Sequence, residues 1–132
     1  MQPLTRIVTS INEKYIDAYG ILQIKVLDGV HIDLMSLKED HASDFCLTGH
    51  NQVLAFFDAR AFFSITKEAR DYVNSGIMDK TRLATAVLIN NLAVRTLMNG
   101  FSHINKPKTP FKVFTSEDKA IEWLLLHKKI TS

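Results

Sequence analysis

Two apolar runs decide the fold that this sequence predicts: Val53-Leu54-Ala55-Phe56-Phe57 and Leu83-Ala84-Thr85-Ala86-Val87-Leu88-Ile89. Short runs with little polar alternation are typical of strands that are buried on both faces. Helical patterns lie between and around the two runs, and strands that alternate with helices form parallel sheets with right-handed crossovers. We therefore expect the two runs to lie side by side within a sheet, with helices packed on both of its faces.

The segment before the first run predicts an antiparallel hairpin at the edge of this sheet. Alternating apolar positions over Arg6–Ile16 predict one strand, and Leu22–Val26 alternates apolar and polar residues in a second. Asp17–Gly20 joins them as a turn, in which Gly20 is free to adopt a positive φ.

The residues after the hairpin change to helical spacing and predict a helix from Leu34 to Phe45, with Gly49 as its stop. Its expected inward face contains Leu34, Leu37, His41, Ala42 and Phe45. Its expected solvent face contains Lys38, Glu39, Asp40 and Asp44.

Three further helices complete the pattern. Thr66 precedes a helix over Lys67–Val73, and Asn90 or Asn91 begins one whose apolar stripe is Ala93, Leu97 and Phe101. After a proline-containing loop and a brief strand at Phe111–Phe114, Ser116 begins the last helix, whose inward residues are Ala120, Ile121, Leu124 and Leu125. The predicted order is therefore ββαβαβαβα.

Length and composition fit one ordinary globular domain over residues 1–132. The formal net charge of +2 is too balanced to indicate nucleic acid or a membrane surface as a partner. The apolar runs are shorter than the about 20 residues that a membrane-spanning helix needs. Cys46 is the only cysteine, and the N-terminus lacks the pattern of a secretory signal, so we expect a cytoplasmic protein without disulfides.

The predicted order of elements is similar to that of the STAS domain, the fold of the sporulation anti-sigma-factor antagonists. The local sequence resembles a group of small uncharacterised bacterial proteins related to that fold. Two stretches carry this resemblance: Asp58-Ala59-Arg60 with Ser64 to Tyr72, and Asn105-Lys106-Pro107 through Pro110 with Phe114-Thr115, Glu117 to Ala120, Trp123 and Leu124. The resemblance implies a STAS-like α/β fold and a non-enzymatic regulatory module that acts through protein–protein contacts.

In the phosphoregulated antagonists, a strand ends in Asp, and Ser-Ser-Gly or Ser-Thr-Gly follows closely at a helix start. Here Asp58 ends the strand, but the next hydroxyl groups belong to Ser64 and Thr66, and no glycine follows them. Because this motif is absent, the resemblance does not carry the phosphoswitch to this chain. The simpler interpretation is that these hydroxyls cap a helix. The alternative is phosphorylation, where the phosphate would meet the positive helix end and pair with Arg60, Lys67 or Arg70.

Other candidate contact residues lie at the expected ligand edge of the sheet. Asp58 ends a central strand, where open α/β sheets bind ligands, although such a carboxylate more commonly orders the following loop. Phe62 and Phe63 form either an exposed interaction patch or a packing contact for the loop. Lys106 and its neighbouring lysines form a solvated rim or contact an acidic partner.

Several residues have side chains suited to metals, but their spacing is poor. His31, Asp33, His41, Cys46 and His50 contain no His-x-x-x-His or Cys-x-x-Cys pair, so we expect no metal site. The chain also lacks a Gly-x-Ser-x-Gly nucleophile turn and a glycine-rich phosphate-binding loop. We therefore expect no enzymatic activity and no cofactor.

Two functions remain. The first is a regulatory module that binds a protein partner through Asp58–Arg70, with the Asn105–Lys112 loop beside it. The second is a small-ligand or lipid-binding domain of the Sec14-like type, since the many Phe, Leu and Ile residues could enclose an apolar pocket. A homodimer that pairs through the hairpin edge is compatible with both.

Overall fold

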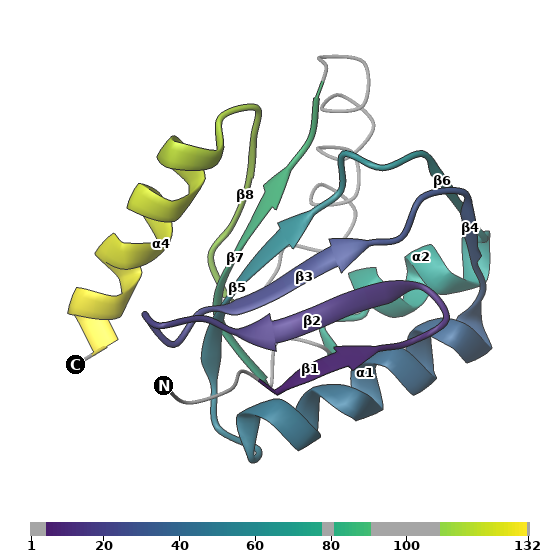
Figure 1. Ribbon diagram of the computed structural model, residues 1–132, viewed down its shortest axis with the longest axis horizontal. Coiled ribbons are helices and arrows are strands. Elements are labelled where there is room, and N and C mark those ends of the chain that lie inside the picture. The colour runs from purple at the N-terminus through teal and green to yellow at the C-terminus, as the bar shows by residue number, and fades with distance from the viewer. Residues whose placement is uncertain (1–4, 78–80, 91–108, 132) are drawn as a thin grey trace.

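The computed structural model describes residues 5–77, 81–90 and 109–131 (Figure 1). The elements of these residues are, in order, β1 (Arg6–Val8), β2 (Asn12–Ile16), β3 (Leu22–Val26), β4 (Val30–Ile32), α1 (Leu34–Thr48), β5 (Val53–Asp58), β6 (Phe63–Ile65), α2 (Lys67–Asn74), β7 (Arg82–Leu88), β8 (Phe111–Phe114) and α4 (Glu117–Thr131). The helix predicted after Asn90 lies outside the described residues. None of the helices in these ranges is long and apolar enough to cross a membrane.

Six strands form one sheet in the order β1-β2-β3-β5-β7-β8. Strands β3, β5, β7 and β8 run parallel, whereas β2 is antiparallel to both of its neighbours, β1 and β3. The two apolar runs form β5 and β7, which pair from Val53 and Arg82 to Asp58 and Leu88. The predicted α/β class, with a mostly parallel sheet and an antiparallel N-terminal edge, is confirmed.

The N-terminal edge differs from the prediction in one respect, because Arg6–Ile16 forms two strands. The chain turns between them, where the hydroxyl of Thr9 accepts hydrogen bonds from the backbone N–H groups of Ile11 (3.3 Å) and Asn12 (3.1 Å). A threonine hydroxyl competes in this way with ladder hydrogen bonds and favours a turn. The edge is therefore a three-stranded antiparallel meander in which β1 is outermost.

A second small sheet joins β4 to β6, and neither strand was predicted. Each is three residues long, which is too short for a hydrophobic period to be recognised. They pair in parallel, from Val30 and Phe63 to Ile32 and Ile65. This pairing places the connection after β5 beside the connection after β3.

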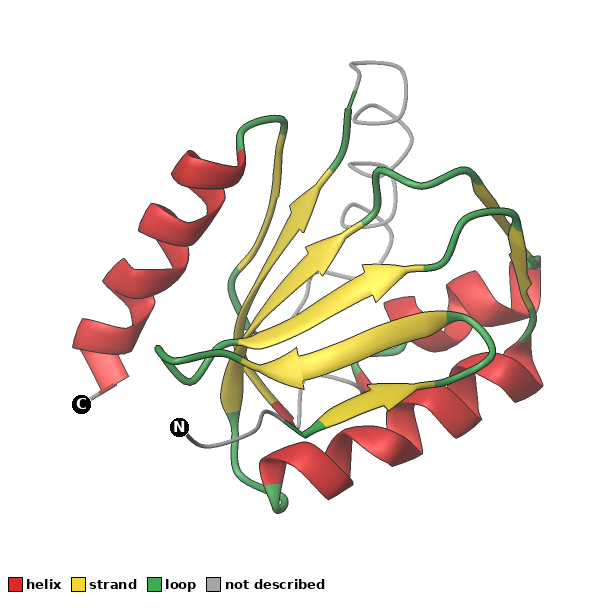
Figure 2. Ribbon diagram, in the orientation of Figure 1, coloured by secondary structure: helices red, strands yellow, loops and turns green. Residues whose placement is uncertain are grey.

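Helices cover both faces of the main sheet, as predicted (Figure 2). On one face, Phe56 of β5 packs in a core with Ala120 and Leu124 of α4. On the other face, the next residue, Phe57, packs against a core that contains Leu37 of α1 and Ala69 of α2. Adjacent residues of a strand point to opposite faces, so β5 contributes to both cores.

Helix α1 begins and ends as the sequence predicts, but its buried face is different. Asp33 caps it by accepting a hydrogen bond from the backbone N–H of Ser36, and Gly49 ends it with a φ of 61°. The predicted solvent residues Asp40 and Asp44 are buried, whereas Ala42 is exposed. The reason is that cationic side chains from the sheet meet these carboxylates.

Candidate functional site

The predicted site residues Asp58 and Arg60 form an ion pair at the carboxyl end of β5. Asp58 is the last residue of the strand and is 9% exposed. The Arg60 guanidinium donates to both of its carboxylate oxygens, from Nε at 3.0 Å and from Nη2 at 2.8 Å. The backbone N–H of Arg60 adds a third hydrogen bond of 3.1 Å, so the carboxylate also orders the loop, as the simpler interpretation predicts.

Arg60 keeps Asp58 ionised. Burial of Asp58 would raise the pKa of its carboxyl group, but hydrogen bonds from the Arg60 side chain and backbone outweigh that effect. The charges of Arg60 and Lys25 act in the same direction, and the pKa lies below its ordinary 3.8. In return, the pKa of Arg60 is raised by its hydrogen bonds to Asp58. Glu117, at the start of α4, lies 3.7 Å from the same guanidinium.

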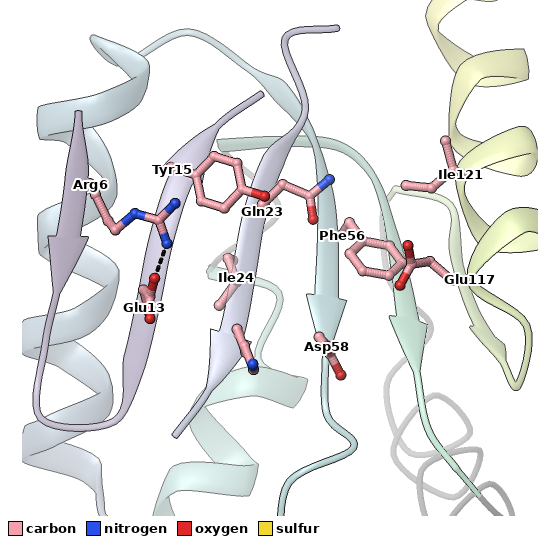
Figure 3. A pocket seen from close by; sticks show the side chains of 10 residues that line it. Arg6, Glu13, Tyr15, Gln23, Ile24, Phe56, Asp58, Glu117 and Ile121 are labelled. Atoms are coloured by element: carbon pink, nitrogen blue, oxygen red, sulfur yellow. Dashed lines mark hydrogen bonds and ion pairs between the residues drawn. The ribbon is translucent and has the colours of Figure 1, made fainter. Parts of the chain in front are cut away.

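An open groove of about 320 Å³ lies beside this ion pair, and its lining residues come from β1, β2, β3, β5 and α4 (Figure 3). Two rows of paired residues on one face of the sheet supply most of the lining. The first row is Arg6, Tyr15, Gln23 and Phe56, and the second contains Glu13, Lys25 and Asp58. Ile24 of β3, together with Glu117 and Ile121 of α4, completes the lining. The groove thus combines two aromatic rings and two isoleucine side chains with charges of both signs.

Phe62 and Phe63 have separate environments. Phe63, in β6, packs against two of the hydrophobic cores, as a loop-packing aromatic should. Phe62 is 81% exposed, which makes it the most exposed large apolar side chain among the described residues. Its backbone is held firmly, because its N–H donates to Asp28 Oδ1 (3.1 Å) and its carbonyl accepts from Gly29 N–H (2.7 Å).

The two candidate hydroxyl groups also have different positions and partners. Thr66 caps α2, with its hydroxyl accepting a hydrogen bond from the backbone N–H of Ala69 at 3.2 Å, as predicted. Ser64 lies in β6 and is no cap; its exposed hydroxyl is 2.6 Å from Nδ1 of His31 on the paired strand β4. Arg70 is partly buried in the first turns of α2, and its backbone N–H donates to the carbonyl of Thr66.

The remaining candidates do not form a common site. Lys106 lies outside the described residues. Of the residues with metal-binding side chains, His41 is buried in α1, Cys46 is exposed on it, and His50 stacks on Phe45. Within residues 5–77, 81–90 and 109–131, no three His, Cys, Asp or Glu side chains are grouped so that they could hold a metal ion.

Comparison with protein-family models gives a match over residues 15–128 to a domain of unknown function, DUF7793. The chain belongs to the DUF7793 family. No curated protein matches it. Among solved structures, it is similar to an uncharacterised DUF3478-family protein from Shewanella loihica PV-4 with a SpoIIAA-like fold. The sequences are 12% identical, the match covers 92% of each chain, and the TM-score is 0.57. The predicted STAS-like fold is therefore confirmed for this DUF7793 chain.

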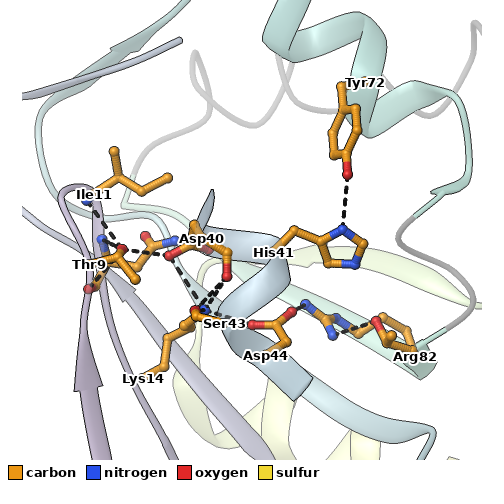
Figure 4. Close-up of polar contacts among 11 residues, drawn as sticks. Thr9, Ile11, Lys14, Asp40, His41, Ser43, Asp44, Tyr72 and Arg82 are labelled. Carbon is orange, nitrogen blue, oxygen red and sulfur yellow. Dashed lines mark hydrogen bonds and ion pairs between the residues drawn. The ribbon is translucent and has the colours of Figure 1, made fainter. Parts of the chain in front are cut away.

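This DUF7793 chain also contains a buried charged cluster that the sequence did not predict (Figure 4). Its members are Lys14 of β2, Asp40 and Asp44 of α1, and Arg82 of β7. Lys14 Nζ donates to Asp44 Oδ1 (2.7 Å) and to the carbonyl of Asp40 (2.6 Å), and Arg82 Nη2 donates to Asp44 Oδ2 (2.8 Å). Two cations face two carboxylates, so the cluster is electrically balanced and orients α1 on the sheet. The i, i+4 spacing of Asp40 and Asp44 is the feature of the sequence that could have indicated a common face.

His41 of α1 lies beside this cluster (Figure 4). Burial lowers the pKa of its imidazole, and the nearby charges of Arg82 and Lys14 lower it further, against the opposing effect of Asp44 and Asp40. Its Nδ1 lies 3.0 Å from the hydroxyl of Tyr72 on α2. The imidazole thus links the two helices that cover this face of the sheet.

Proposed function

We propose that this protein is a non-enzymatic regulatory module, of the same kind as the anti-sigma-factor antagonists, that binds a protein partner. The binding surface, which we call the Phe62 surface, consists of Asp28, Asp58, Arg60, Phe62 and Glu117. A hydrogen bond joins Phe62 to Asp28 after β3. Ion pairs join Arg60 to Asp58 at the end of β5 and to Glu117 at the start of α4. The SpoIIAA-like fold supports this class of function.

The exposed, well-held side chain of Phe62 is the observation that carries the proposal. Burying a fully exposed aromatic ring is a large favourable contribution to binding, and aromatic residues and arginine dominate binding hot spots. The backbone of Phe62 is already held by Asp28 and Gly29. Binding to a partner therefore costs less free energy for ordering this loop than it would if the loop were flexible.

The chemistry of Asp58 supports a binding role over a catalytic one. Both oxygens of its carboxylate are engaged by Arg60, and its pKa is lowered. A general acid or base works best with a pKa near the operating pH, so Asp58 is poorly suited to proton transfer. We also propose that the protein acts in the cytoplasm, because Cys46 is an exposed free thiol, which suits a reducing compartment.

Of the two hydroxyls considered for phosphorylation, Ser64 is the one whose modification would leave the α2 cap intact. Its hydroxyl is exposed, and it follows Phe62 by two residues. A phosphate there would add about −1.5 to −2 charges next to the Phe62 surface. If it regulates binding, Ser64→Asp should weaken capture of the partner while Ser64→Ala does not, and intact-mass measurement of protein from the native host should show a phosphorylated fraction.

Affinity capture from the native host, quantified by mass spectrometry, tests the proposal. Phe62→Ala is the test variant, and Met35→Ala is the matched control because Met35 is 72% exposed on α1, outside the Phe62 surface. The expected result is a specific partner that Phe62→Ala loses and Met35→Ala retains. Identical partner profiles for the two variants, or no partner for the wild type, would contradict the proposal.

A second candidate function is the binding of a small molecule, and the groove is the observation that favours it. Its volume of about 320 Å³ is at the lower end of ligand pockets. Its charged rim suits a ligand that carries a polar group, such as a lipid head group. Native mass spectrometry of freshly purified protein tests this function: a bound small molecule that Gln23→Trp displaces would support it, and a clean unliganded mass would argue against it.

A further inference from the structure

We infer that the partner surface that fits Phe62 is the groove on a second copy of this chain, so that two copies insert their Phe62 side chains into each other. This inference rests on the proposed function, because it names the partner of the Phe62 surface. It concerns a different contact from strand pairing at the β1 edge.

The first argument is the match between the exposed ring and the groove. Tyr15 and Ile121 are partly exposed and provide apolar surface on the two sides of the groove, whereas Phe56 is 4% exposed and contributes little (Figure 3). A cavity of about 150 Å³ with apolar walls is large enough for a benzene ring. The groove, at about 320 Å³, therefore has room for a phenyl side chain together with part of its loop.

The second argument is that Phe62 and the groove are close to each other along the chain. Asp58 lines the groove, its ion-pair partner is Arg60, and Phe62 follows two residues later. A twofold axis brings the same surface of both copies together, so every contact between different parts of that surface occurs twice. Phe62 is four residues after Asp58, so their Cα atoms lie at most about 14 Å apart. At this separation, one such axis allows both insertions at once.

The third argument is electrostatic. The groove and the Phe62 surface together carry charges of both signs in nearly equal number, with cations at Arg6, Lys25 and Arg60 and anions at Glu13, Asp28, Asp58 and Glu117. A face with one dominant sign repels its own copy, whereas a mixed face can be complementary to itself.

Sedimentation velocity over a range from low micromolar to near-millimolar protein tests the inference. The wild type should show a concentration-dependent dimer, and Phe62→Ala should weaken it by at least about tenfold, as loss of a hot-spot residue does. Met35→Ala should dimerise like the wild type. Since Phe62 and Met35 are both exposed, both variants should fold, and circular dichroism confirms this before the comparison.

A mixing experiment tests whether the groove is the site that receives the Phe62 side chain. Gln23→Trp fills the floor of the groove but keeps Phe62, whereas Phe62→Ala keeps an open groove. Neither variant alone can form the contact, but a mixture can form it once, so the mixture should associate more strongly than either variant alone. A wild type that stays monomeric, a dimer insensitive to Phe62→Ala, or a mixture without gain would overturn the inference. In those cases, host-cell capture of a different, Phe62-dependent partner would still support the proposed function.

Discussion

Lys14→Met removes the ammonium group from the buried charged cluster while keeping an unbranched side chain of similar length. Lys14 is fully buried, and its Nζ donates to Asp44 Oδ1 and to the carbonyl of Asp40. In the variant, Asp44 keeps only Arg82 as a cationic partner, and the Asp40 carbonyl loses the ammonium donor but keeps the Ser43 hydroxyl. Two buried anions then face one buried cation.

Breaking a buried ion pair by removing one partner costs about 3–5 kcal/mol of unfolding free energy. We expect a value near the lower end, about 3 kcal/mol, because Arg82 still neutralises part of the Asp44 charge. With a urea dependence of about 2 kcal/mol per molar, the unfolding midpoint should fall by about 1.5 M.

Urea unfolding followed by circular dichroism measures this change. Lys25→Met is the matched control, because Lys25 is an exposed lysine on the neighbouring strand β3 and should change stability by less than about 0.5 kcal/mol. A double-mutant cycle with Asp44→Asn should give a coupling free energy of about 1 kcal/mol or more. A loss below about 1 kcal/mol for Lys14→Met, or additive single changes, would refute the role assigned to the cluster.

Three further outcomes are expected from single positions. The pKa of His41 is lowered in the folded protein, so the free energy of unfolding should keep its full value above the ordinary pKa of 6.5 and fall as the pH decreases below it. His41→Gln should reduce this pH dependence, which urea unfolding at two pH values measures. Thr66→Ala should cost about 1 kcal/mol through loss of the α2 cap, and Thr66→Ser should recover most of it in thermal unfolding, so equal midpoints would argue against the cap. Gly49→Ala should cost about 1 kcal/mol because position 49 has a φ of 61°, and an unchanged urea midpoint would contradict this.

The central architecture could be predicted because its strands and helix ends are indicated by residues that lie close together in the sequence. The runs that form β5 and β7 lack polar alternation, which only strands covered on both faces can tolerate. The capping residues Asp33 and Thr66 and the stop at Gly49 act within one helical turn of the chain. Local spacing is therefore enough to predict these elements.

The charged cluster could not be predicted because the contacts that bury it form only in the tertiary structure. Asp40 and Asp44 look like solvent residues until Lys14, from a strand far away in the sequence, and Arg82 are brought to the same face. Strands β4 and β6 could not be predicted for the same reason, because each has three residues that form their ladder with the other strand. For the candidate site, the sequence indicated Asp58, Arg60 and Phe62, but the exposure of Phe62 and the groove beside it depend on the assembled sheet.

The central claim, that Phe62 is a contact residue for a protein partner, is tested most directly by photo-crosslinking. A photoreactive phenylalanine analogue at position 62 should form a discrete covalent adduct with a second protein chain in the native host after irradiation, and the same analogue at position 35 should form none. Absence of an adduct from position 62, or equal adducts from both positions, would contradict the claim.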